Sequence, residues 1–195
     1  MSEKLVVSVI GAGGKMGVRT TNNLAKHRDS IDLFFCENAA AGIRNIRERG
    51  FDVTPAEVAV SKSDIVVLAV PDKVMKEVSV GIVAMMTPGA TCVILDPAAA
   101  VAKELALRDD CTFVVTHPCH PSYFLDQDTY EARHDYFGGV AAKQDIVVAK
   151  IQGDDDSFAK ARTVCELMFA PVANSYVMGI RDIAFLEPTL VEVLG

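Results

Sequence analysis

A run of glycines directly after the first apolar segment is the feature that most limits how this chain can fold. Residues 5–10 are apolar and largely β-branched, as in a buried strand, and they lead into the sequence GAGGKMG at residues 11–17. In such a turn the first glycine permits a tight strand-to-helix corner, the middle glycines let backbone N–H groups approach a phosphate, and the last allows close helix packing. The segment therefore predicts a dinucleotide-binding turn rather than a mere tight corner. Its expected contacts are Gly11, Gly13, Gly14, Lys15, Met16 and Gly17, with Met16 at the position of the third glycine of G-x-G-x-x-G.

Short apolar runs alternate with helical segments along the rest of the chain, the rhythm of an α/β fold. Strands that are apolar throughout suit a parallel sheet with helices on both faces. We therefore expect a doubly wound Rossmann domain at residues 1–178, whose mainly parallel sheet is extended by two further strands. The expected strands are residues 5–10, 31–36, 51–53, 65–70, 91–95, 112–116, 146–151 and 172–177.

The last residues of the chain have a different pattern. Between residues 179 and 195, apolar side chains recur on one helical stripe. We expect this segment to be the first helix of an α-helical second domain for substrate binding and dimerisation, which is truncated or absent here.

An acidic residue follows the second expected strand. Glu37 lies 20 residues after Gly17, where a carboxylate accepts hydrogen bonds from the adenosine ribose and repels a 2′-phosphate. This favours NAD over NADP as the cofactor. Two alternatives stay open: Glu37 is only a solvated loop acid, or Arg44 or Arg47 turns back toward a 2′-phosphate.

Two turns follow later strands at the same expected edge of the sheet. Val70, Pro71 and Asp72 form one of them, and Asp96 belongs to the other. Ligands of open α/β sheets bind at this carboxyl edge, so we assign these residues to the cofactor site. Both aspartates are also expected to serve as N-caps of the helices that follow.

The sequence HPCHP at residues 117–121 brings two histidines to the carboxyl edge of the strand at 112–116. A neutral imidazole can take the proton of a hydroxyl group while hydride leaves its carbon, and His117 is the preferred base. His120 and Glu187, a carboxylate on the apolar stripe of the last helix, are the other catalytic candidates. The alternatives are histidines that only shape the loop, a domain-interface salt bridge at Glu187, and a metal site, although H-x-C-H matches no recognised metal-ligand spacing. The aromatic segment at residues 123–137 is a candidate lid.

Composition excludes several classes of function. The formal net charge is −7, with 26 acidic and 19 basic residues, so nothing draws the chain to nucleic acid or an anionic membrane. We expect a cytoplasmic location, because the sequence has no signal-peptide pattern and no apolar stretch near the roughly 20 residues that span a bilayer. The five cysteines include no C-x-x-C pair and are expected to be reduced.

Taken together, GAGGKMG, Glu37, LAVPD at residues 68–72, HPCHP and FLEP at residues 185–188 resemble the 6-phosphogluconate-dehydrogenase-like superfamily of hydroxyacid dehydrogenases. Within it the chain looks most like the proteins labelled phosphogluconate dehydrogenase, a group that includes the D-apionate oxidoisomerases. The resemblance implies NAD-dependent oxidation of a small sugar acid, an isomerisation step, and a homodimer. Well-studied members use a lysine on the first interdomain helix, yet no lysine follows Lys160, which favours His117 as the base and Glu187 as acid or substrate ligand.

The leading hypothesis is thus an NAD-dependent oxidoreductase that acts on the hydroxyl group of a small sugar acid or related hydroxyacid. The alternative from another class is a non-catalytic dinucleotide-binding module, or the cofactor-binding fragment of a larger dehydrogenase. Measuring NAD binding and turnover separately distinguishes the two.

Overall fold

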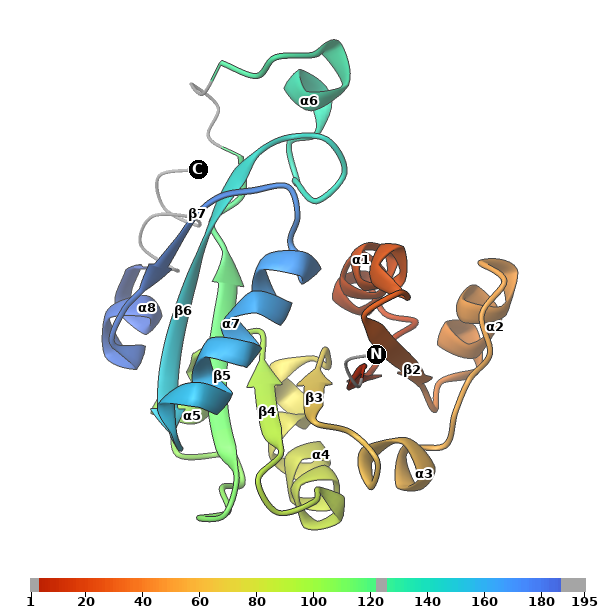
Figure 1. Cartoon of the computed structure of the whole chain (residues 1–195), viewed down its shortest axis with the longest axis vertical. Coiled ribbons are helices and arrows are strands. Elements are labelled where there is room, and N and C mark those ends of the chain that lie inside the picture. The colour runs from red at the N-terminus through yellow and green to blue at the C-terminus, as the bar shows by residue number, and fades with distance from the viewer. Residues whose placement is uncertain (1–3, 122–125, 187–195) are drawn as a thin grey trace.

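A seven-stranded sheet forms the centre of the computed structural model, which describes residues 4–121 and 126–186 (Figure 1). The strand order is β2-β1-β3-β4-β5-β6-β7. Strands β1 to β5 pair in parallel, β6 runs antiparallel to β5, and β7 is parallel to β6. The prediction of a mainly parallel sheet extended by two further strands is therefore confirmed. The strands are β1 (Leu5–Ile10), β2 (Ile31–Cys36), β3 (Ile65–Leu68), β4 (Thr91–Ile94), β5 (Thr112–Pro118), β6 (Gln144–Gln152) and β7 (Val172–Val177).

Helices cover both faces of this sheet. On one face α1, α2 and α7 share a buried apolar cluster with the strands, and on the other face α3, α4, α5 and α8 share a second one. Two apolar faces explain why the central strands are hydrophobic at most positions on both sides. The helices are α1 (Lys15–Leu24), α2 (Ala40–Glu48), α3 (Ala56–Val60), α4 (Asp72–Met85), α5 (Ala98–Val101), α6 (Tyr130–His134), α7 (Asp155–Met168) and α8 (Ile180–Leu186), with a 3₁₀ turn at Ala25–His27.

Residues 51–53 do not form a strand of the sheet, contrary to the prediction. Val53 makes a single isolated bridge to Phe35 of β2, and the ring of Phe51 stacks on that of Phe35 at 4.5 Å between centroids. Pro55 follows closely and cannot donate to a ladder, so pairing stops after one contact.

The strand expected at residues 112–116 is longer than predicted and includes His117. Antiparallel pairing with β6 continues to the end of β5, where His117 lies opposite Val147 and Pro118 opposite Ile146. The base candidate therefore lies on a strand with a fixed register rather than in a loop.

The remaining features agree with a reduced, compact α/β chain. All five cysteines are free, and four of them are buried. Ile183 of α8 is 1 % exposed and belongs to the second apolar cluster. Within residues 4–121 and 126–186, no helix has the length and apolar character to cross a membrane.

Candidate functional site

The predicted site residues collect at one edge of the sheet, because parallel strands all end on the same side (Figure 1). Gly11 follows β1, Glu37 follows β2, Asp72 follows β3, and Asp96 follows β4. His117 lies at the end of β5. In the sheet, β2 lies on one side of β1 and β3 on the other. The glycine turn that follows β1 therefore lies at the point where the order of the strands reverses.

The glycine turn has the shape that a phosphate-binding corner needs. Gly11 has φ +81, and a Cβ there would lie 2.6 Å from the carbonyl oxygen of Ala69. At Gly17 a Cβ would overlap the Gly11 carbonyl oxygen and Ala12. Gly17 rather than Met16 thus provides the close packing, and Met16 instead packs partly buried against the apolar cluster.

Helix α1 begins immediately after this turn, with Gly14 as its N-cap and no side chain capping it. The first N–H groups of a helix have no partner within the helix, and its N-terminus carries a partial positive charge. An anion at this position is therefore stabilised by both effects.

Glu37 is fixed by backbone N–H groups from both sides. Its Oε2 atom accepts a hydrogen bond from Gly13 N at 3.1 Å, and Oε1 accepts from Asn38 N and Ala39 N, each at 2.9 Å. A carboxylate has about four acceptor positions, so a place is left for a hydroxyl donor. The structure thus puts this carboxylate beside the glycine turn, where it suits an adenosine ribose.

The two aspartates behave differently. Asp96 Oδ1 accepts from Ala98 N, the first N–H of α5, at 2.6 Å, but the N-cap position itself is occupied by Pro97, so Asp96 lies one residue before its predicted cap position. Asp72 is the first residue of α4, with Pro71 in the N-cap position and no side-chain cap. The capping prediction for Asp72 is therefore wrong, because the extended backbone of Pro71 starts the helix one residue early.

Asp72, Asp96 and His117 interact electrostatically at the ends of three neighbouring strands. Partial burial raises the pKa of Asp72, the like charge of Asp96 raises it further, and His117 opposes both effects. The carboxylate of Asp72 therefore interacts with both Asp96 and His117 at this edge of the sheet.

His117 is oriented by the strand beside it. Its Nδ1 atom lies 3.0 Å from the carbonyl oxygen of Leu95. A carbonyl oxygen only accepts, so Nδ1 carries the proton in the neutral imidazole, and Nε2 carries the lone pair. In this tautomer Nε2, and not Nδ1, is the ring nitrogen that can accept a proton.

His120 lies in the strained turn that follows. Its φ is +58, in the left-handed region that residues with a Cβ rarely adopt. Its Nδ1 atom lies 3.0 Å from the carbonyl oxygen of Phe137, and its ring centroid lies 6.3 Å from that of His117. Burial lowers the pKa of His120, and the positive charges of Arg19 and Lys15 lower it further against the opposing hydrogen bond.

Several contributors to this site were not found from the sequence. Leu95 orients His117 through its carbonyl group, which no side-chain pattern reveals. Gly42 leaves room for Glu37, because a Cβ there would lie 2.5 Å from Glu37 Oε2. Phe137 belongs to the aromatic segment that was expected to form a lid, but its contact with His120 depends on tertiary folding.

Two further predictions concern Glu187 and a possible metal site. Glu187 lies outside the described residues. Among the residues that are described, no group of three or more His, Cys, Asp or Glu side chains is arranged to hold a metal ion.

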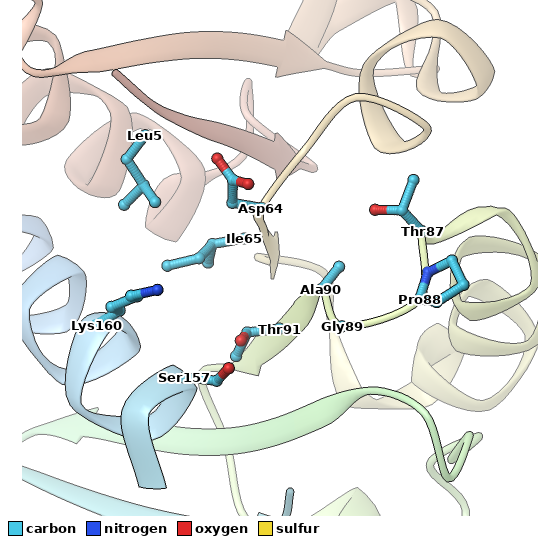
Figure 2. A pocket seen from close by; sticks show the side chains of 10 residues that line it. All are labelled: Leu5, Asp64, Ile65, Thr87, Pro88, Gly89, Ala90, Thr91, Ser157 and Lys160. Carbon is cyan, nitrogen blue, oxygen red and sulfur yellow. The ribbon is translucent and has the colours of Figure 1, made fainter. Parts of the chain in front are cut away.

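A pocket of about 210 Å³ lies at the opposite, amino edge of the strands (Figure 2). Figure 2 shows Lys160 and Ser157 of α7 on one side and Thr87 and Pro88 on the other. Residues of the glycine turn and the histidine loop do not line it. This hollow is therefore separate from the carboxyl edge.

Comparisons with known proteins agree with the fold. Residues 125–195 match the family model described as phosphogluconate dehydrogenase (decarboxylating) C-term. A D-apionate oxidoisomerase of Blautia hydrogenotrophica is 62% identical over 98% of this chain and 67% of its own length. One from Pectobacterium atrosepticum is 41% identical over 100% of this chain and 67% of its own length.

A solved structure from Cupriavidus necator is also similar, a semialdehyde dehydrogenase NAD-binding protein in complex with calcium and NAD. It has a TM-score of 0.92 and 37% identity, and the match covers 98% of this chain and 72% of that chain. The chain thus spans 67%, about two thirds, of the length of each of the two curated relatives named above. At this level of identity and coverage, the chain belongs to the family of the D-apionate oxidoisomerases.

Proposed function

We propose that the chain is an NAD-dependent oxidoreductase that oxidises a hydroxyl group of a small sugar acid and then isomerises the keto product. One observation carries this proposal: the glycine turn of α1 and the oriented His117 lie at the same edge of the sheet. The names of the relatives, oxidoisomerases of D-apionate, and the NAD complex of the Cupriavidus structure support it.

The residues at this edge fit an NAD molecule. The uncapped N-terminus of α1 suits the diphosphate, and the carboxylate of Glu37 suits the adenosine ribose. Val70, Pro71 and Asp96, at the ends of β3 and β4, suit the nicotinamide half, which would lie toward His117. When bound, NAD supplies the acceptor for the hydride.

His117 removes the hydroxyl proton of the substrate through Nε2. The contact with the Leu95 carbonyl holds the ring in one tautomer, so no reorientation is needed before proton transfer. The same protonated His117 can return its proton to a neighbouring oxygen of the keto product, which is the acid step that an isomerisation requires.

The same proposal includes a role for Glu187, the domain boundary, the cellular location and the oligomeric state. Glu187 acts as an acid or a substrate ligand, and the dinucleotide-binding domain ends at residue 178. The protein is a cytoplasmic homodimer. Exposed apolar side chains on the edge strand β7 support an interface there, since Tyr176 is 50% and Val177 is 55% exposed.

The proposal is tested by separating binding from turnover. NAD binding to the purified chain is measured by titration calorimetry, and D-apionate and other sugar acids are then screened for NADH formation. Binding together with turnover supports the proposal. Binding without turnover of any sugar acid supports the alternative of a non-catalytic or incomplete dinucleotide-binding unit, and failure of both refutes the assignment of the site.

A further inference from the structure

Three groups that can carry positive charge surround the ring of Phe137. Lys15 Nζ lies 4.3 Å from the ring centroid, and Arg19 Cζ lies 4.7 Å from it. The His120 ring centroid lies 5.0 Å away. Lys15 and Arg19 are one turn apart on α1, so both side chains project from the same face of the helix.

Within the described residues, no carboxylate forms an ion pair with this group. Among the ion pairs of the described residues, none includes Lys15, Arg19 or His120. Asp135 attracts Arg19 electrostatically, but no ion pair joins them, and Asp135 Oδ2 accepts hydrogen bonds from the N–H groups of residues 140–142. Within the described residues, the positive charge around Phe137 is therefore balanced only in part, by Asp135.

Arg19 makes this imbalance costly. The residue is only 8% exposed, and its Nη2 donates to a neutral acceptor, Gln144 Oε1, at 2.8 Å. Its Nε and Nη1 atoms are buried without a hydrogen-bond partner. Burial lowers the pKa of Arg19 to about 10 against the attraction of Asp135, so the guanidinium is still charged at neutral pH. A buried cation with unused donors indicates that an anion belongs nearby.

We propose that Lys15 is a specificity-determining residue whose Nζ atom pairs with the carboxylate of the sugar-acid substrate. Arg19, which stacks on Phe137 from the same helix face, is a positioning residue that holds the ring and adds positive potential. This inference rests on the proposed function, since it assigns the substrate carboxylate to a place beside the base.

His120 links this charged group to the proposed base. It contacts Phe137 at 5.0 Å between ring centroids and has its ring centroid 6.3 Å from that of His117. The substrate carboxylate then lies on the Phe137 side of His120, and the reacting hydroxyl group on the His117 side. The diphosphate of NAD has a separate place, because the backbone N–H groups at the start of α1 serve it without the Lys15 side chain.

The experiment compares Lys15→Met with the unchanged chain. Two equilibria are measured by calorimetry: binding of NAD, and binding of D-apionate to the complex with NADH. The kcat and KM of D-apionate and of its neutral primary amide are measured in parallel. Lys62→Met is the matched control, because it removes an exposed lysine from the turn that precedes β3, at the opposite edge of the sheet.

We expect Lys15→Met to weaken D-apionate binding and raise its KM about tenfold or more, the loss of a charge-assisted contact. NAD affinity should fall by a smaller factor than D-apionate affinity, the amide should be unaffected, and Lys15→Arg should restore most of the loss. An equal loss of NAD affinity would show that Lys15 pairs with the diphosphate instead. No change in any equilibrium would overturn the inference while leaving the proposed function intact, whereas absence of turnover in the unchanged chain would count against the proposed function itself.

Discussion

The Nδ1 atom of His117 lies 3.0 Å from the carbonyl oxygen of Leu95, so the neighbouring strand β4 sets the orientation of the imidazole. Because β4 and β5 pair in register up to Ile94 and Val115, the contact is fixed by the sheet and not by a mobile side chain. The sheet thereby presents Nε2 as the basic atom.

We expect His117→Asn to lower kcat by about 10² to 10⁴, the usual contribution of a general base. Asparagine can still donate to the Leu95 carbonyl, so the fold and the NAD affinity should be kept. His134→Asn is the control, because the Nδ1 atom of His134 likewise contacts a carbonyl, that of Tyr130, at 2.8 Å but on the exposed helix α6. Equal losses in both variants, measured by NADH formation, would remove His117 from its role.

Asp72 gives a prediction for the pH dependence of stability. Its pKa is raised in the folded state, mainly by partial burial and then by Asp96. A carboxyl with a raised folded pKa costs stability above that pKa, and the cost disappears as the pH falls below the unfolded value, where both states are protonated. Asp72→Asn should therefore raise the melting temperature at pH 7.5, by a small amount because the side chain is partly solvated.

The difference between Asp72→Asn and the unchanged chain should shrink as the pH is lowered toward 4. Asp109→Asn, at an exposed position of the turn before β5, should show no such trend. A melting temperature for Asp72→Asn that falls below that of the unchanged chain at pH 7.5 would mean that the attraction of His117 for Asp72 outweighs burial.

The sequence was sufficient for the sheet, because each of its seven strands overlaps one of the predicted strands. The strand predicted at residues 51–53 was wrong for a physical reason. The residue types of a short segment do not show whether it forms a full ladder or only one bridge, as Val53 does with Phe35. The site was predicted as far as it depends on position after a strand, as with Glu37 and His117. Arg19 could not be found this way, because its burial between the rings of Phe137 and Phe169 brings together segments far apart in the chain.

Cofactor preference is expected to depend on the charge of Glu37. Glu37→Ala should weaken NAD binding and improve NADP binding relative to it, by a change in the ratio of about tenfold, because repulsion of the 2′-phosphate is removed. The measurement is calorimetric titration with each nucleotide. Glu48→Ala, at the exposed C-terminal end of α2, serves as the control. An unchanged ratio would support the alternative in which Glu37 only holds the turn through Gly13 and Ala39.

Two glycines in helices provide a test of the phosphate-binding corner. In α1, the Cβ of Gly17→Ala would overlap the Gly11 carbonyl oxygen and Ala12, which are backbone groups of the turn itself. We expect a loss of about 1–3 kcal/mol in the free energy of unfolding, as for other overpacked sites, and weaker NAD binding.

In α4, a Cβ at Gly81 meets nothing within 4 Å, so Gly81→Ala should instead stabilise the chain by about 0.5–1 kcal/mol. Urea unfolding and NAD titration of both variants give the comparison. If Gly17→Ala kept full stability and NAD affinity, the turn would tolerate a wider corner. Close packing of α1 against the turn would then not be required for the phosphate site.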